Sequence, residues 1–178
     1  GGHCFGLSVL STLFYEGEAK PIVFGARETP QLELAGNTSL QREIAYSWTF
    51  QALGAVRGQA IKGTPSAILD ALTRCFYTED RGGETYTLAF VNRQGRGGHA
   101  VTPYAVEDRG NGQYAVLVYD NNHPGEEREM LIDRTADTWS YVASTNPKRP
   151  SGRYSGDAKT ESLFLFPNNV GLGLQPCP

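Results

Sequence analysis

The first part of the chain places apolar residues at the spacing of a helix. From Cys4 to Tyr15 they recur every three or four positions, and Gly17 follows where a helix can end in a left-handed residue. The apolar positions are Phe5, Val9, Leu10, Leu13 and Phe14. Because small polar residues fill the gaps between them, the pattern predicts a largely buried helix that begins at Cys4.

Two further helices are indicated by their start signals. Thr38 and Gln41 form the Thr-x-x-Gln pattern of a capping box, which predicts a helix that ends near Gly58. Thr64 followed by Pro65 predicts a second start, with the threonine as N-cap and the proline at the first helical position. The apolar faces that follow are Leu40, Ile44, Trp48 and Ala52 in one helix and Ile68, Leu69, Leu72, Cys75 and Phe76 in the other.

After residue 80 the period of the pattern changes to that of strands. Short β-rich runs, separated by glycine, asparagine and proline, follow one another up to residue 167. The runs are ETYTLAFVN, HAVTPYAVE, QYAVLVYD, REMLID, TWSYVAS and SLFLFP. Helices first and strands second predict an α+β fold with an antiparallel sheet. We expect one domain over residues 1–167, helical to about residue 80 and β-rich over about 84–167, followed by a tail or linker at 168–178.

Composition and net charge serve mainly to exclude classes of function. Of 178 residues, 39% are hydrophobic and 20% are charged, as in an ordinary globular domain. The net charge of -3 provides no basic surface for nucleic acid, and no apolar run approaches the roughly 20 residues that cross a bilayer. We therefore expect neither a nucleic-acid partner nor membrane insertion. The glycine start, in place of a charged leader, suggests a processed part of a longer chain with further domains, and the glycine- and asparagine-rich loops are compatible with an exported protein.

Of the three cysteines, Cys4 stands in the least usual place. Cys75 falls on the apolar face of its predicted helix and is interpreted as core, and Cys177 lies in the predicted tail. Cys4 instead opens a helix, directly after Gly2 and His3. The positive end of the helix dipole and the unpaired N–H groups of the first turn favour a thiolate at that position. Cys4 is therefore a candidate nucleophile.

A predicted hairpin supplies a base for this thiol. His99 begins one of its strands, and the return strand ends in the sequence Tyr-Asp-Asn-Asn. Two registers are open, one that places His99 opposite Asn121 and one that places it opposite Asp120. A tight turn at Asn111 and Gly112 would shift the register again. Either of the two registers brings an amide or a carboxylate beside the imidazole.

A histidine held by a carboxylate or amide, together with a thiol at a helix start, is a geometry for nucleophilic catalysis. The imidazole takes the thiol proton, and the third residue fixes the imidazole tautomer. A zinc site formed by His3, Cys4, His99 and Asp120 is the alternative, because all four residue types bind zinc. These residues lack the spacing of a known zinc motif, and adjacent His3 and Cys4 would chelate poorly. We therefore expect no metal and no cofactor.

The stretch HCFGLS resembles the Cys-aromatic-small-apolar-Ser segment that opens the central helix of papain-like cysteine peptidases. GGHAV is similar to the histidine-bearing strand of that group. VLVYDNN is similar to the strand with its third residue, an aspartate in the bacterial branch that includes bacteriocin-leader peptidases. The resemblance implies a two-lobed papain-like fold, with Cys4 as nucleophile and His99 as base and acid. It makes Asp120 the residue that orients the imidazole, with Asn121 next in line.

By motif the resemblance covers residues 3–15 and 97–125, and it leaves the oxyanion hole open. In the family, this hole usually combines the N–H of the cysteine with a glutamine about six residues upstream. Only three residues precede the cysteine in this sequence. Either the glutamine lies in a segment outside the sequence, or His3 or a glutamine brought in by the fold replaces it. Gly2, His3 and Gly98 are predicted to line the substrate and oxyanion side.

The expected activity is hydrolysis of a peptide or protein through an acyl-enzyme on Cys4. The same residues would also serve an acyltransferase or amidase, and a weak catalyst would bind peptides as a pseudoenzyme. Tyr104, Trp139 and Tyr141 are candidates for the walls of the substrate cleft. Trp48, like Trp139, is interpreted as an aromatic residue of the core or of the lobe interface.

Overall fold

The computed structural model describes residues 2–78, 84–92, 97–143 and 152–173, and it has the α+β fold with an antiparallel sheet that the sequence predicts. The helices are α1 (Cys4–Glu16), α2 (Thr38–Thr49), α3 (Gly54–Gln59), α4 (Pro65–Tyr77) and α5 (Asn169–Leu172), with 3-10 turns at Pro21–Phe24, Thr29–Gln31 and Phe50–Ala52. The strands are β1 (Ile61–Gly63), β2 (Tyr86–Val91), β3 (Gly98–Gly110), β4 (Gln113–Tyr119), β5 (Arg128–Asp133), β6 (Thr138–Ala143), β7 (Gly152–Asp157) and β8 (Leu163–Pro167).

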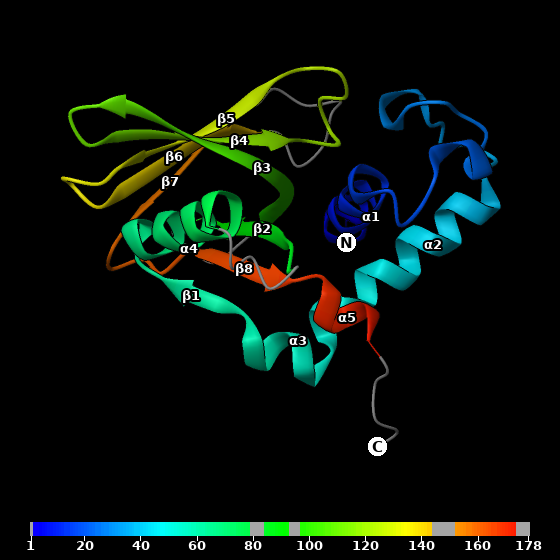
Figure 1. Cartoon of the computed structure of the whole chain (residues 1–178), viewed down its shortest axis with the longest axis horizontal. Coiled ribbons are helices and arrows are strands. Elements are labelled where there is room, and N and C mark those ends of the chain that lie inside the picture. Colours follow the sequence, from blue (N-terminus) through cyan, green and yellow to red (C-terminus); the bar gives the residue numbers. More distant parts are fainter. Residues whose placement is uncertain (1, 79–83, 93–96, 144–151, 174–178) are drawn as a thin grey trace.

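The strands form one antiparallel sheet in the order β1-β8-β2-β3-β4-β5-β6-β7. Strand β3, with 13 residues, joins its two parts, because its first residues pair with β2 and the remainder pair with β4. A bulge between Pro103 and Ala105 lies close to the point where the strand changes partner. Figure 1 shows the curvature that results, which gives the sheet the form of a half-barrel.

Helix α4 packs in the curve of this half-barrel, against strands β2–β6 and β8. Ile68, Leu69 and Leu72 are 0% exposed, and full burial of such a side chain stabilises the fold by about 1.5–3 kcal/mol before the entropy of ordering is subtracted. The predicted start of the helix is confirmed. The Thr64 hydroxyl accepts a hydrogen bond of 3.3 Å from the N–H three residues later, and Pro65 occupies the first helical position.

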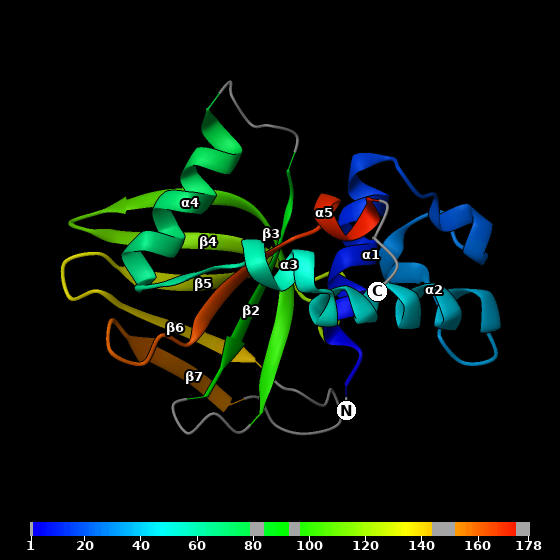
Figure 2. The ribbon, with the colours of Figure 1, turned by 90° about the horizontal axis from the view of Figure 1, so that it is seen from below.

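Helix α1 packs on the other face of β2 and β3. Figures 1 and 2 show α1 and α2 together on one side of β3, with strands β4–β7 extending on the other side. The second core consists of Phe5, Val9, Leu10, Leu13, Leu40, Ile44, Phe50 and Ala100. At Gly6 the backbones of α1 and α2 approach so closely that a Cβ would collide with the Ile44 carbonyl oxygen. The helix ends at a left-handed Gly17 (φ 79°), as predicted.

The second helix differs from the prediction at both ends. Its N-cap is Asn37, whose side chain accepts a hydrogen bond of 3.2 Å from the N–H of Leu40, and Thr38 is already helical. The helix ends at Thr49 instead of near Gly58, because a 3-10 turn and an extended residue separate it from α3.

Strands β1 and β7 and helix α5 have no counterpart in the sequence prediction. Strand β1 lies in the segment expected to be helical, and it pairs with β8, so the predicted division at about residue 80 does not separate helices from sheet. Helix α5 lies in the predicted tail at 168–178. Asn168 is 1% exposed, and its side chain accepts a hydrogen bond of 2.9 Å from the Thr87 hydroxyl. Packed structure therefore continues past residue 167, whereas Cys177 lies outside the described residues.

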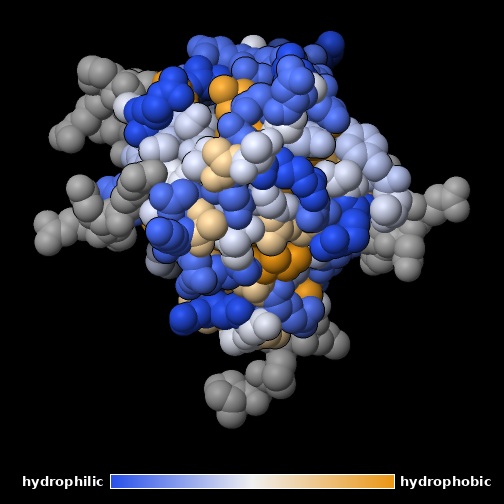
Figure 3. All heavy atoms as spheres, turned by 90° about the vertical axis from the view of Figure 1, so that its left-hand side faces the viewer, coloured by the Kyte–Doolittle hydropathy of each residue, from blue (hydrophilic) through white to orange (hydrophobic). Residues whose placement is uncertain are grey.

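The side of the molecule where the strand hairpins end has a polar surface. Figure 3 shows hydrophilic side chains over most of this face, with apolar residues confined to small separate areas. Within the ranges that the structure describes, no helix has both the length and the apolar character that crossing a membrane requires.

Candidate active site

The Cys4 thiol lies at the N-terminus of α1. Cys4 is the first helical residue, and the preceding N-cap residue, His3, forms no hydrogen bond that caps the helix with its side chain. The first N–H groups of a helix have no intrahelical acceptor. The backbone groups of Phe5 in this turn and of Ala100 in β3 form hydrogen bonds with the Cys4 sulfur. Cys4 is only partly buried, so the sulfur is held by backbone donors while the residue remains partly exposed to solvent.

The hairpin that carries His99 closes with a tight two-residue turn, as considered in the sequence analysis. Asn111 and Gly112 form it with φ values of 54° and 79°, which match the twist of the two strands. The ladder between β3 and β4 ends with Thr102 opposite Tyr119, so His99 has no directly opposed partner on β4. Both registers proposed from the sequence are therefore wrong. The imidazole is instead contacted by Asp120, the residue that directly follows β4.

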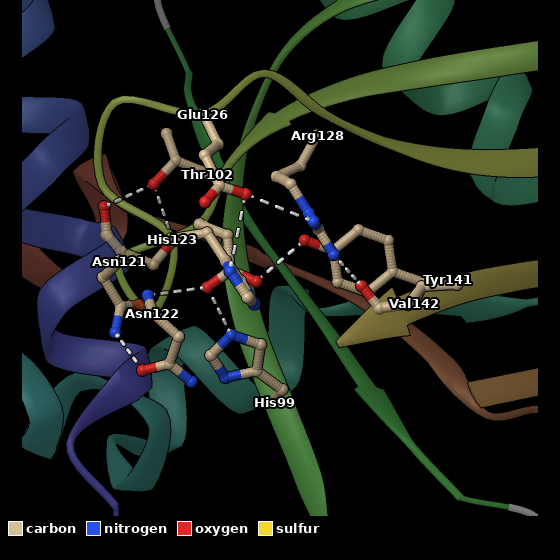
Figure 4. A network of polar contacts seen from close by, with 11 residues as sticks. His99, Thr102, Asn121, Asn122, His123, Glu126, Arg128, Tyr141 and Val142 are labelled. Atoms are coloured by element: carbon tan, nitrogen blue, oxygen red, sulfur yellow. Dashed lines mark hydrogen bonds and ion pairs between the residues drawn. The ribbon is translucent and has the colours of Figure 1, made fainter. Parts of the chain in front are cut away.

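Three residues meet at the imidazole of His99. Its Nε2 atom lies 2.7 Å from Oδ1 of Asp120, and the two side chains are only 1% and 0% exposed. Oδ1 also accepts a hydrogen bond of 2.9 Å from the N–H of Asn122, and Oδ2 accepts one of 2.8 Å from the hydroxyl of Tyr141 (Figure 4). The Cys4 thiol is hydrogen-bonded to the His99 ring. Because Asp120 occupies Nε2, the ring atom left for the sulfur is Nδ1.

These contacts shift the pKa values of all three groups. Burial by itself would lower the pKa of His99, but the hydrogen bonds and charges of Asp120 and Cys4 raise it to about 9. Burial by itself would raise the pKa of the Cys4 thiol, but the hydrogen bond and charge of His99 bring it below its ordinary value. The pKa of Asp120 is also lowered, because its hydrogen bonds outweigh the effect of burial. The contacts therefore stabilise the thiolate form of Cys4 and the imidazolium form of His99 relative to their neutral forms.

Among the residues predicted to act in catalysis, the structure brings Cys4, His99 and Asp120 together. It does not place Asn121 against the imidazole. The side-chain amide of Asn121 instead donates a hydrogen bond of 3.2 Å to the side chain of Asn122. Of the two residues proposed to orient the imidazole, Asp120 is therefore the one that contacts it.

The residues predicted for the oxyanion side have other surroundings. Gly2 is exposed, and a Cβ there would meet no atom within 4 Å. The ring of His3 packs edge-on against Trp48 of α2, with 6.1 Å between centroids, and Trp48 is 39% exposed rather than a core residue. Gly98 has a packing role, because a Cβ at this position would collide with the carbonyl oxygen of Phe90 in β2.

The exposure of His99 also differs from the expectation. The glycines before it suggest an open imidazole, but His99 is 3% exposed, and Phe90 packs edge-on against it with 5.9 Å between ring centroids. Cys4 is the partly exposed member of the pair. The sulfur is therefore carried by the more accessible residue of the pair.

Tyr141 is a positioning candidate that the sequence did not reveal. It is predicted as a cleft wall, yet it is 1% exposed and belongs to the core. The guanidinium of Arg128 lies 6.0 Å from the centre of its ring and donates to the carbonyl of Val142 (Figure 4). Trp139, the second predicted wall, is also buried at 2%. The alternation in TWSYVAS is the sequence signal for this burial, because it places Trp139 and Tyr141 on the same face of the strand.

A second buried network fixes α1 against the sheet. The hydroxyls of Ser8 and Thr102 lie 3.0 Å apart, and the Thr102 hydroxyl also lies 3.0 Å from the Ser8 carbonyl oxygen. Ser8 donates to Thr87 over 3.3 Å, and Thr87 donates to Asn168 over 2.9 Å. Ser8 lies one turn after the thiol, and Thr102 lies on the strand that carries the imidazole. The network therefore sets how closely these two elements approach one another.

Replacing Tyr141 with phenylalanine tests its role in holding the carboxylate. The change leaves Oδ2 of Asp120 without its hydroxyl donor, which should lower the free energy of unfolding by about 1–3 kcal/mol. The loss should be present at neutral pH and shrink as Asp120 becomes protonated, because the hydroxyl stabilises the charged form. Denaturant unfolding between pH 3 and 8 measures it. Tyr154→Phe is the matched control, since that ring also packs on Phe90; an equal loss in both variants would contradict the assignment.

Comparison with known proteins identifies no relative of this chain. No family model matches the chain, and neither the curated proteins nor the solved structures searched contain a match. Among the described residues, no group of three or more histidine, cysteine, aspartate or glutamate side chains is arranged to hold a metal ion. A functional proposal must therefore rest on the side-chain geometry around Cys4.

Proposed function

We propose that this protein is a cysteine peptidase that hydrolyses peptide bonds through the thiolate of Cys4, as papain-like enzymes do. The observation that carries the proposal is the line of contacts from the Cys4 sulfur to the His99 ring and on to Asp120 at 2.7 Å. A thiol with a lowered pKa, a base with a raised pKa and a fixed carboxylate are the parts that nucleophilic acyl transfer requires.

The acylation step uses these groups in order. The Cys4 sulfur attacks the carbonyl carbon of the scissile bond, and the carbonyl oxygen of the tetrahedral intermediate becomes negative. The backbone N–H groups at the start of α1, that of Cys4 included, are the donors available to stabilise this oxygen. His99 then donates its proton to the leaving amine, the carbon–nitrogen bond breaks, and a thioester remains on Cys4.

Hydrolysis of the thioester returns the site to its starting state. Water adds to the thioester carbonyl while His99 takes a proton from it, and the carboxylic acid product leaves as the thiolate reforms. Asp120 holds the Nε2 proton throughout, which keeps Nδ1 directed at the sulfur and the substrate. This role needs a carboxylate that cannot rotate, and hydrogen bonds from the N–H of Asn122 and the hydroxyl of Tyr141 prevent its rotation.

The proposal is tested by labelling the nucleophilic thiol covalently and by detecting the products of peptide hydrolysis. A mixture of unstructured peptides is incubated with the reduced protein at neutral pH, and new peptide termini are identified by mass spectrometry. A peptidyl acyloxymethyl ketone should form one thioether, on Cys4, and His99→Ala should prevent its formation. Labelling of Cys4 and Cys75 at equal rates, without new termini, would contradict the proposal. Products that contain an added primary amine in place of water would identify an acyltransferase instead.

A further inference from the structure

A cavity of about 760 Å³ lies along the second half of α1, between that helix, α4 and strands β2 and β3. We propose that it binds an organic cation with an apolar or aromatic body. Its volume lies within the range of about 300–1,000 Å³ that small-molecule sites occupy. Cys75, interpreted as core from the sequence, is only partly buried and forms part of this wall.

The cavity is separate from the thiol. Its first contact on α1 is Ser11, seven residues after Cys4, which corresponds to about 10 Å along the helix axis. Neither Cys4 nor the His99 and Asp120 side chains line it. The buried hydroxyl network around Ser8 lies between the two places along the helix. An occupant of the cavity would therefore not contact the reacting atoms.

The walls of the cavity are rich in aromatic side chains. They come from each of the surrounding elements, and they include Phe14, Tyr15, Phe76, Tyr77, Tyr86 and Tyr104. Tyr77 is 60% exposed, yet its hydroxyl donates to the carbonyl of Val106 at 2.9 Å and accepts from the N–H of the same residue at 3.2 Å. This ring is therefore held in place before any ligand binds. Faces of tyrosine and phenylalanine rings attract cations through the ring quadrupole.

The charges at the cavity are negative. Glu16 and Glu84 line it, and none of the described lining residues is lysine, arginine or histidine. Glu84 is fixed, because its carboxylate accepts hydrogen bonds from two backbone N–H groups, at 3.0 and 2.7 Å. Burial raises the pKa of Tyr86, Glu84 raises it further, and the nearby Arg74 offsets this only in part. Burial and two further glutamates likewise raise the pKa of Tyr104.

Aromatic walls and negative charge together favour one class of ligand. A neutral apolar molecule would use the walls but not the carboxylates, and an anion would be repelled by both. An ammonium or guanidinium group on an apolar body uses both features, with attraction of about 0.5–2 kcal/mol for each well-placed ring. The same chemistry occurs in a free amine and in a basic side chain of a peptide, so the probe must be a small cation without a peptide backbone.

The test is a titration of the full chain by ¹H–¹⁵N NMR with benzyltrimethylammonium. Phenylacetate and benzyl alcohol serve as the anionic and neutral counterparts. We expect shift changes at the amides of Thr12, Tyr86 and Tyr104, and a Kd for the cation at least about tenfold below that for benzyl alcohol. Tyr104→Leu should weaken cation binding about tenfold. Tyr46→Leu, which removes an exposed ring from α2, should leave it unchanged.

Three results would overturn the proposal. Equal affinity for the cation and for benzyl alcohol would show that charge is not recognised, and shift changes elsewhere in the chain would show that the cavity is not the site. Either result leaves peptide hydrolysis by Cys4 untouched, because the cavity does not contain the thiol or the imidazole. A basic peptide that binds there when benzyltrimethylammonium does not would likewise contradict a site for small cations.

Discussion

Replacing Cys4 with alanine should reduce the rate of peptide hydrolysis by at least about 10⁴-fold, because no thioester can then form. The expected loss is in kcat, since the thiol reacts with the substrate carbonyl and contributes little to holding the rest of the peptide. A continuous assay with a fluorogenic form of the peptide cut most rapidly measures it. The Cys4 side chain is only partly buried, so the variant should remain folded.

Cys75 supplies the matched control for this experiment. It is a partly buried cysteine on α4, it is not among the residues that contact the imidazole, and its thiol donates to the Glu84 carbonyl at 3.5 Å. Cys75→Ala should keep hydrolysis within about twofold of the unchanged protein, as expected for a residue outside the reaction. Retained activity in the Cys4 variant, or its loss in the Cys75 variant, would remove Cys4 from the mechanism.

Replacing Asp120 with alanine should lower kcat by about 10²–10⁴-fold, because the imidazole loses both its orientation and its countercharge. The pKa of His99, about 9 in the intact site, should fall, since burial lowers it and the opposing carboxylate is gone. The alkaline limb of the pH–rate profile should therefore move to lower pH. Rates measured between pH 5 and 10 show whether it moves.

Replacing Asp120 with asparagine separates orientation from charge. The amide oxygen can still accept the Nε2 proton of His99, so the tautomer is kept, while the negative charge is lost. We expect a smaller loss of kcat than with alanine but the same direction of shift in the alkaline limb. Equal rates for the unchanged protein and both variants would show that Asp120 does not support the imidazole.

The sequence alone is sufficient to choose Cys4 and His99, and it leaves Asp120 and Asn121 as the two candidates for the third residue. Cys4 opens an apolar helix, His99 lies in the first strand of a hairpin, and Asp120 directly follows the second strand, so local patterns are enough to indicate each of them. The exact pairing is not predictable in this way. The turn at Asn111 and Gly112 and the bulges beyond it shift the ladder, and the carboxylate reaches the ring only after the strand has ended.

The features that were missed depend on contacts between distant segments. Tyr141 is a core residue whose hydroxyl donates to a carboxylate just beyond the end of β4, and an alternating pattern indicates its face but not that partner. Strand β1 has three residues, too few for a periodic signal, and it exists because β8 offers an edge. By composition Asn168 is assigned to a linker, yet the buried hydroxyl of Thr87 holds it in the fold.

The central claim is that His99 holds Cys4 as a thiolate, and the pH dependence of Cys4 alkylation tests it most directly. Iodoacetamide labelling of Cys4 is followed from pH 5 to 10 by peptide mass analysis, in the unchanged protein and in His99→Ala. The account predicts that the unchanged protein reacts well below the ordinary thiol pKa of about 8.5, and that labelling of the variant requires a higher pH, because burial is then opposed only by the backbone hydrogen bonds of Phe5 and Ala100. The same profile in both proteins would contradict the account.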